Sequence, residues 1–208
     1  MTSVNDVRAF RNACWQHQFR PVAIWSPGAL NSKGHPIKGA GKRPVGLNWR
    51  EKALRNPPYA VTAAISSLAL NTGLLAEEVA AVDVDVPVQP LADQTVHCIE
   101  RTLGPTPLAR IGRSPKILLV YRRETPLAKL FTPELYLPDD TKMQVEVLGV
   151  GQQFVADGIH PDTGQPYTWT DGSPATVPLA ELPVVDEDRL RVMLAACEAL
   201  LRAAGAVE

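Results

Sequence analysis

Apolar residues along the chain recur with two different periods, and each period predicts a type of secondary structure. A spacing of three or four positions over residues 4–19 and 186–204 predicts an amphipathic helix near each end of the chain. Two shorter helical segments are expected at 61–68 and 95–103. Runs of β-type residues predict strands at 21–25, 79–86, 116–122, 145–148, 153–156 and 167–169.

The strand-rich middle of the chain determines the expected fold class. Residues 149–151 are Gly-Val-Gly and separate the strands predicted at 145–148 and 153–156, which indicates a hairpin. Strands joined in this way and flanked by helices predict an α+β fold with an antiparallel or mixed sheet. At 208 residues the chain is long enough to bury a core without disulfides or structural metals.

The overall charge gives no attraction to nucleic acid, because the formal net charge is -1. A polyanion would need a local basic patch, and the main basic stretch lies within residues 28–58. Three isolated cysteines, an odd number, are typical of a reducing compartment. No apolar run reaches the roughly 18 to 20 residues of a membrane span, and no signal-peptide core begins the chain. We therefore expect a cytoplasmic protein without a membrane partner.

Two carboxylates lie two residues apart in the apolar strand predicted at 79–86. The period of a strand places Asp83 and Asp85 on one face and the neighbouring valines on the other. Their mutual repulsion is relieved by a cation, and hard oxygen ligands of this kind suit Mg²⁺ or Mn²⁺ bound together with phosphates. Alone, the pair fits an exposed strand face with two solvated aspartates equally well.

Glu146 repeats this pattern, because Val145 and Val147 would face the core while the carboxylate points the other way. A lone glutamate of this kind is more often a plain surface residue. Three carboxylates from two adjacent strands, however, are what a two-metal phosphoryl-transfer site needs.

The loop before the strand predicted at 116–122 is a candidate triphosphate clamp. Its cations are well suited to hold phosphate oxygens, and Gly112 allows close backbone approach; the candidate contacts are Arg110, Arg113, Ser114 and Lys116. A basic turn with solvated arginines is the alternative interpretation. The spacing of a Walker phosphate loop is absent from the sequence. His160 has no second histidine or cysteine nearby, so the sequence gives no support for zinc there and favours a turn residue.

Taken together, these segments resemble the bifunctional DNA primase/polymerase N-terminal domain, a branch of the archaeo-eukaryotic primase superfamily. The resemblance covers roughly residues 20 to 180. Each segment is short, and their order along the chain is what makes the resemblance specific: 41–44 with Asn48 and Trp49, 71–73, 82–86, 113–116, 145–147, 158–164 and 167–169.

The resemblance implies one catalytic domain over 1–208, with an RRM-like sheet over 76–180, a smaller N-terminal α/β unit over 1–75 and a C-terminal helix over 186–204. The active site is expected in the cleft between the unit and the sheet. Metal ligands carry over to Asp83, Asp85 and Glu146. Many relatives have Ser-x-His in the second motif, where this chain has Ser114-Pro115-Lys116, so Lys116 is expected to take the place of the histidine.

The remaining contacts implied by the resemblance concern the substrates. His160 joins Arg110, Arg113, Ser114 and Lys116 as a candidate contact of the nucleoside triphosphate. The matching N-terminal motif supplies candidates for the cleft or the template backbone, namely Lys42, Arg43, Asn48 and Trp49. For Trp49, a core position is the alternative. Expected partners are a single-stranded DNA template and, in a longer protein, a helicase or accessory domain.

The leading hypothesis is a template-directed nucleotidyltransferase, a DNA primase or polymerase dependent on Mg²⁺ or Mn²⁺, of phage, plasmid or mobile-element replication. A non-catalytic replication-initiation module that binds DNA or nucleotide is the alternative, because the second motif is altered. A metal-dependent nuclease is a third hypothesis, because carboxylate clusters also hydrolyse phosphodiesters. The cationic loop favours a triphosphate substrate over the phosphodiester substrate of a nuclease.

Overall fold

The computed structural model describes residues 3–208, and the first two residues of the unit expected over 1–75 lie outside this range. The helices are α1 (Val4–Gln16), α2 (Trp49–Ala53), α3 (Tyr59–Thr62), α4 (Gln89–Leu103), α5 (Glu187–Ala203) and the 3₁₀ turn η1 (Leu179–Glu181). The strands are β1 (Pro21–Ile24), β2 (Asn71–Leu75), β3 (Val79–Asp85), β4 (Ala109–Arg113), β5 (Lys116–Arg122), β6 (Leu130–Phe131), β7 (Leu135–Tyr136), β8 (Lys142–Leu148), β9 (Gln153–Asp157) and β10 (Thr168–Trp169).

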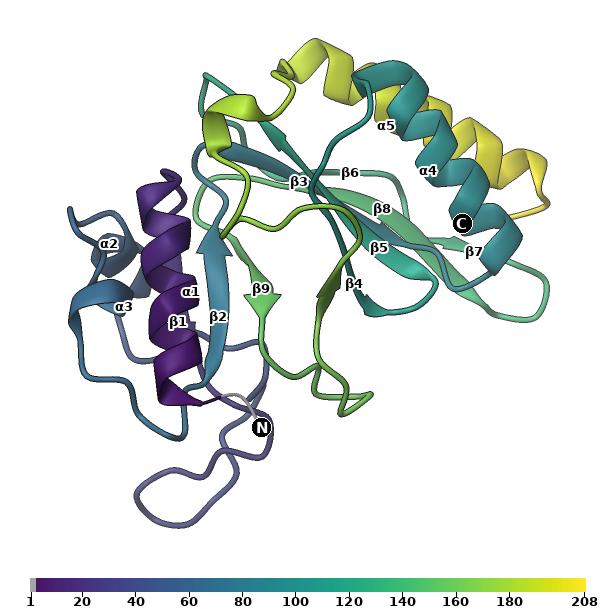
Figure 1. The fold of residues 1–208 in the computed structure, drawn as a ribbon. Coiled ribbons are helices and arrows are strands. Elements are labelled where there is room, and N and C mark those ends of the chain that lie inside the picture. Colours follow the sequence, from purple (N-terminus) through teal and green to yellow (C-terminus); the bar gives the residue numbers. More distant parts are fainter. Residues whose placement is uncertain (1–2) are drawn as a thin grey trace.

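The strands form two antiparallel sheets, which confirms the expected α+β class (Figure 1). The smaller sheet has three strands in the order β1-β2-β9, and α1, α2 and α3 lie beside it. This sheet together with its three helices is called the smaller unit below. The larger sheet has the order β10-β4-β5-β3-β8-β6, with β7 paired to β8. Both helices that cover the larger sheet, α4 and α5, lie on one of its faces (Figure 1). An RRM-like arrangement of this sheet stays a prediction.

The alternating sequence of β3 gives its two faces different surroundings. Val82, Val84 and Val86 are fully buried against residues of α4 and α5. On the opposite face, Val79 and Ala81 are buried with residues of α1, β2 and β9. The smaller unit therefore covers only the beginning of this second face and leaves the positions beyond Ala81 partly open.

Two of the predicted elements are wrong, and one is longer than expected. The strands at 145–148 and 153–156 do not form a hairpin, because β8 pairs with β3 and β9 pairs with β2, so the glycine turn carries the chain from one sheet to the other. The helix expected at 61–68 is replaced by the short α3, and the Ser66 hydroxyl accepts a 3.2 Å bond from the Leu68 amide, a contact that competes with helical hydrogen bonds. Helix α4 begins at Gln89, because Pro90 is tolerated in a first turn.

Within residues 3–208, no helix is both long and apolar enough to cross a lipid bilayer.

One buried side chain joins the basic stretch to the end of β9. Asn71 is 1% exposed, and its amide donates to the carbonyls of Gly41 at 3.0 Å and Ile159 at 2.8 Å. The side-chain Oδ1 of Asn71 accepts a hydrogen bond of 2.9 Å from the Ile159 backbone amide. Gly158, with φ +115°, passes so close to Asn71 that a Cβ there would collide with it.

We expect Asn71→Ala to lower the free energy of unfolding by about 2 to 3 kcal/mol, because it leaves buried backbone groups without partners. Urea unfolding followed by circular dichroism measures this change. Asn5→Ala, at an exposed position of α1, is the control and should change stability by less than about 0.5 kcal/mol. Equal urea midpoints for Asn71→Ala and the unaltered protein would contradict the structural role of this side chain.

Candidate active site

The open part of the β3 face carries the predicted carboxylates. Asp83 lies directly opposite Glu146 of β8, and Asp85 lies opposite Gln144. Residues directly opposed on antiparallel strands share a face, with Cβ atoms about 4.5 to 5.5 Å apart. The structure thus brings the three carboxylates to one face of two adjacent strands.

Two lysines neutralise the outer carboxylates. Lys116 of β5 forms an ion pair with Asp85, and Lys129, in the segment before β6, forms one with Glu146. The contact of Lys129 was not predicted from the sequence, because the two partners are 17 residues apart and only strand pairing brings them together. Burial raises the pKa of Asp83; nearby Arg110 opposes this, while the charges of Asp85 and Glu146 add to it.

Arg110 of β4 lies on the same face, one strand beyond Leu118, which is itself opposite Asp83. Its guanidinium donates to the Val155 carbonyl of β9 and lies 4.7 Å from the centre of the Tyr167 ring. The Arg110 Nε is buried without a hydrogen-bond partner among the described residues. Burial lowers the pKa of Arg110, and the charge of Asp83 raises it. A cation with an unused donor thus lies beside the carboxylates.

His160 faces the same region with a defined proton position. The ring is 5% exposed, and its Nδ1 accepts from the Asp162 amide at 3.2 Å, so the neutral ring carries its proton on Nε2. Burial, followed by the charge of Lys42, lowers its pKa, so the ring is mainly neutral at pH 7. At Gly112 a Cβ would lie 2.5 Å from Tyr167 and 2.9 Å from His160, so only glycine permits this approach.

Asp83, Asp85, Arg110 and His160 line a cavity of about 310 Å³ between the two sheets. Seven of the predicted site residues line it: Lys42, Asp83, Asp85, Arg110, Arg113, Lys116 and His160. Gln153, Phe154 and Val155 of β9 complete the side formed by the smaller sheet. The larger sheet and the smaller unit therefore both contribute walls.

The other predicted residues, Glu146 among them, do not line this cavity. Ser114 lies at the tip of the β4–β5 hairpin and faces a separate hollow beside α4. Arg43 donates to the Lys38 carbonyl at 3.4 Å within the basic stretch. Asn48 precedes α2, and Trp49 packs against the core of the smaller unit.

The carboxylates suit a hard divalent cation in kind, because they offer only oxygen donors. Within residues 3–208, no three His, Cys, Asp or Glu side chains are already gathered to hold a metal ion. Asp85 and Glu146 instead direct their carboxylates to Lys116 and Lys129.

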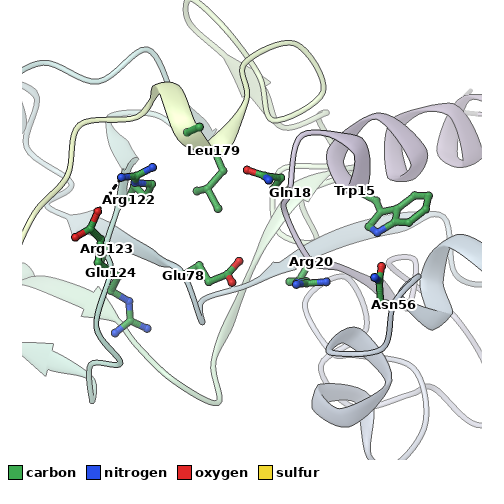
Figure 2. Close-up of a pocket in the computed structure, with 10 residues that line it drawn as sticks. Trp15, Gln18, Arg20, Asn56, Glu78, Arg122, Arg123, Glu124 and Leu179 are labelled. Atoms are coloured by element: carbon green, nitrogen blue, oxygen red, sulfur yellow. Dashed lines mark hydrogen bonds and ion pairs between the residues drawn. The ribbon is translucent and has the colours of Figure 1, made fainter.

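A second cavity, of about 530 Å³, lies between α1, the end of β5 and η1 (Figure 2). Arg122 and Glu124 form an ion pair of 2.9 Å at one side of it, and Trp15 lies at the other (Figure 2). None of the predicted site residues lines this second cavity.

Comparison with known proteins identifies the family of the chain. The family model of the bifunctional DNA primase/polymerase N-terminal domain matches residues 29–185, which include all three carboxylates and the β4–β5 hairpin. No curated protein matches the chain significantly. Because the family model spans well over half of the 208 residues, the chain belongs to the bifunctional DNA primase/polymerase N-terminal family.

Proposed function

We propose that this protein joins nucleoside triphosphates on a single-stranded DNA template, as a primase, a polymerase or both. The observation that carries the proposal is the cluster of Asp83, Asp85 and Glu146 on one sheet face, beside a cationic cavity, in a member of this family. The reaction is an in-line attack of a 3′-hydroxyl on the α-phosphate, with pyrophosphate leaving.

Asp83, Asp85 and Glu146 would hold Mg²⁺ or Mn²⁺. A divalent ion bound there supplies charge neutralisation for the triphosphate and makes the 3′-oxygen a better nucleophile, with two ions dividing these tasks. The partly buried position of Asp83 keeps bulk water away and so strengthens electrostatic contacts.

The triphosphate is held by the cations of the β4–β5 hairpin. Arg110 and Arg113 present planar donors that match phosphate oxygens, while Lys116 provides a point charge. Ser114, at the tip of the hairpin, faces the hollow beside α4 and lies outside this clamp. The Nε2 proton of neutral His160 is a further donor in the same cavity.

The basic stretch would hold the template backbone, with Lys42 lining the cavity, Arg43 next to it in the chain, and Asn48 and Trp49 as the remaining candidates. Residues 28–58 contain seven lysines and arginines and one acidic residue, whereas the rest of the chain contains fourteen and twenty-one. This asymmetry provides local attraction to DNA despite a net charge of -1. We further propose a role in phage, plasmid or mobile-element replication, beside a helicase or accessory domain, on the family likeness alone.

A non-catalytic replication-initiation module is the second candidate. The observation that favours it is that Lys116 and Lys129 already neutralise Asp85 and Glu146. Such a module binds DNA or nucleotide and gives no metal-dependent products.

Replacing both aspartates (Asp83→Ala with Asp85→Ala) should reduce incorporation by on the order of 100-fold or more, because the charge stabilisation of the transition state is lost. The assay uses Mg²⁺ or Mn²⁺, templates with and without a primer, and labelled dNTPs or rNTPs, with products resolved by length. Asp93→Asn, on exposed α4, is the matched control and should retain activity. Intact DNA binding without products from the unaltered protein would favour the initiation module, and shortened DNA a nuclease.

Lys116→Gln should raise the KM for the nucleoside triphosphate about 10- to 100-fold, since it removes one charge-assisted hydrogen bond. Steady-state incorporation with varied triphosphate measures the effect. The control is Lys142→Gln, whose lysine also pairs with a surface carboxylate, Glu134, but lies outside the cavity. An unchanged KM in Lys116→Gln would remove this lysine from the triphosphate clamp.

The double change Lys42→Gln with Arg43→Gln should make the slope of log affinity against log salt for single-stranded DNA shallower by about 1.4, as expected for two lost phosphate contacts. Fluorescence anisotropy at several salt concentrations measures it. Arg191→Gln with Arg202→Gln removes the same charge from α5 and should leave the slope unchanged. Equal slopes for both double variants would place the template elsewhere.

A further inference from the structure

The exposed aromatic ring of Phe131 lies on the same sheet face as the carboxylates. Phe131 of β6 is 59% exposed, and strand pairing places it directly opposite Glu146. Glu146 is in turn opposite Asp83, so the three residues form one row across β3, β8 and β6. Because directly opposed residues share a face, the ring lies on the open face of the sheet.

Lys129 contacts both the ring and the carboxylate. Its Nζ lies 5.6 Å from the centre of the Phe131 ring and also forms the ion pair with Glu146. A cation within about 6 Å of a ring centre is attracted to the aromatic face. Leu130, the preceding residue, packs against the core with α4 and α5, whereas Phe131 belongs to none of the described hydrophobic clusters. The ring therefore has a cation beside it while most of its surface faces solvent.

The charges around β3 indicate on which side of this strand the triphosphate and the DNA lie. The cations of the clamp, Arg110, Arg113 and Lys116, lie on β4 and β5, on one side of β3. Attacking and leaving oxygens are roughly in line in phosphoryl transfer, so the DNA strand approaches from the side opposite the triphosphate. On that side lie β8 and β6 with Phe131.

We propose that Phe131 is a stacking platform for a nucleobase of the DNA strand that lies over β8 and β6. Every base has a flat π-face, so a ring of this kind binds single-stranded DNA without reading its sequence. The inference rests on the proposed function for the direction of the strand. The exposed ring and its position opposite Glu146 are independent of that function.

The test compares DNA with and without bases. Binding of a labelled 20-nucleotide thymidine oligomer and of an abasic oligomer of equal length is followed by fluorescence anisotropy in EDTA. Phe131→Ala should weaken binding of the thymidine oligomer about five- to tenfold and leave the abasic oligomer unchanged. Phe131→Tyr, which keeps the ring, should bind both oligomers within about twofold of the unaltered protein.

Tyr59→Ala is the matched control. Tyr59 is 46% exposed and has the Lys52 Nζ 5.3 Å from its ring centre, but it lies on α3 of the smaller unit. This variant should bind the thymidine oligomer normally, and thermal unfolding should show that Phe131→Ala is folded, because truncation of so exposed a ring removes little packing.

Equal affinity of Phe131→Ala and the unaltered protein for the thymidine oligomer would overturn the proposal, and so would an equal loss on the abasic oligomer. A loss confined to binding of free dATP would overturn the assignment to DNA. If the unaltered protein incorporates no nucleotide but Phe131→Ala loses base-dependent binding, the platform stands and the proposed function fails. If the unaltered protein incorporates nucleotides and Phe131→Ala binds the thymidine oligomer as tightly as the unaltered protein does, the proposed function stands and the platform fails.

Discussion

The structure depends on how the smaller unit packs against one face of β3. The period of the strand sends three valines into the core below α4 and α5 and leaves the other face for contact with the smaller unit. That contact buries Val79 and Ala81 and ends before Asp83. Carboxylates at the edge of a dry interface are less hydrated than at an open surface, so burial raises the pKa of Asp83. The packing that stabilises the fold therefore also creates the electrostatic environment of the site.

The second requirement is that the two sheets keep one relative position. The turn after β8 takes the chain into the smaller sheet, where β9 pairs with β2. At the end of β9, Asn71 binds the backbone of Gly41 and Ile159, which are the neighbours of Lys42 and His160 in the chain. One buried amide thus ties together the two segments that carry Lys42 and His160, both of which line the cavity.

Local patterns predicted those parts of the site that lie on single strands. Strands β3 and β5 and the shared face of Asp83 and Asp85 follow from a period of two, and register then places Glu146 beside them. The hairpin was wrong because two apolar runs around a glycine turn look alike whether they pair together or join different sheets. Lys129 and Phe131 were missed for a related reason, since only the pairing of β6 with β8 gives them neighbours. Trp49 shows a further limit, because its sequence context allows both a cleft contact and a core position, and only the structure shows that it packs in the smaller unit.

The lysines that neutralise Asp85 and Glu146 are compatible with catalysis on energetic grounds. Both ion pairs are partly exposed to solvent, and such pairs typically contribute only about 0 to 1 kcal/mol. These two ion pairs reduce the repulsion among the three carboxylates. Because each pair is weak, it dissociates readily. A triphosphate brings several anionic oxygens, each able to accept a charge-assisted hydrogen bond worth about 1.5 to 3 kcal/mol. Lys116 thus forms a more favourable contact with the triphosphate than with Asp85, and the lysine that reduces repulsion among the carboxylates is also suited to bind the substrate.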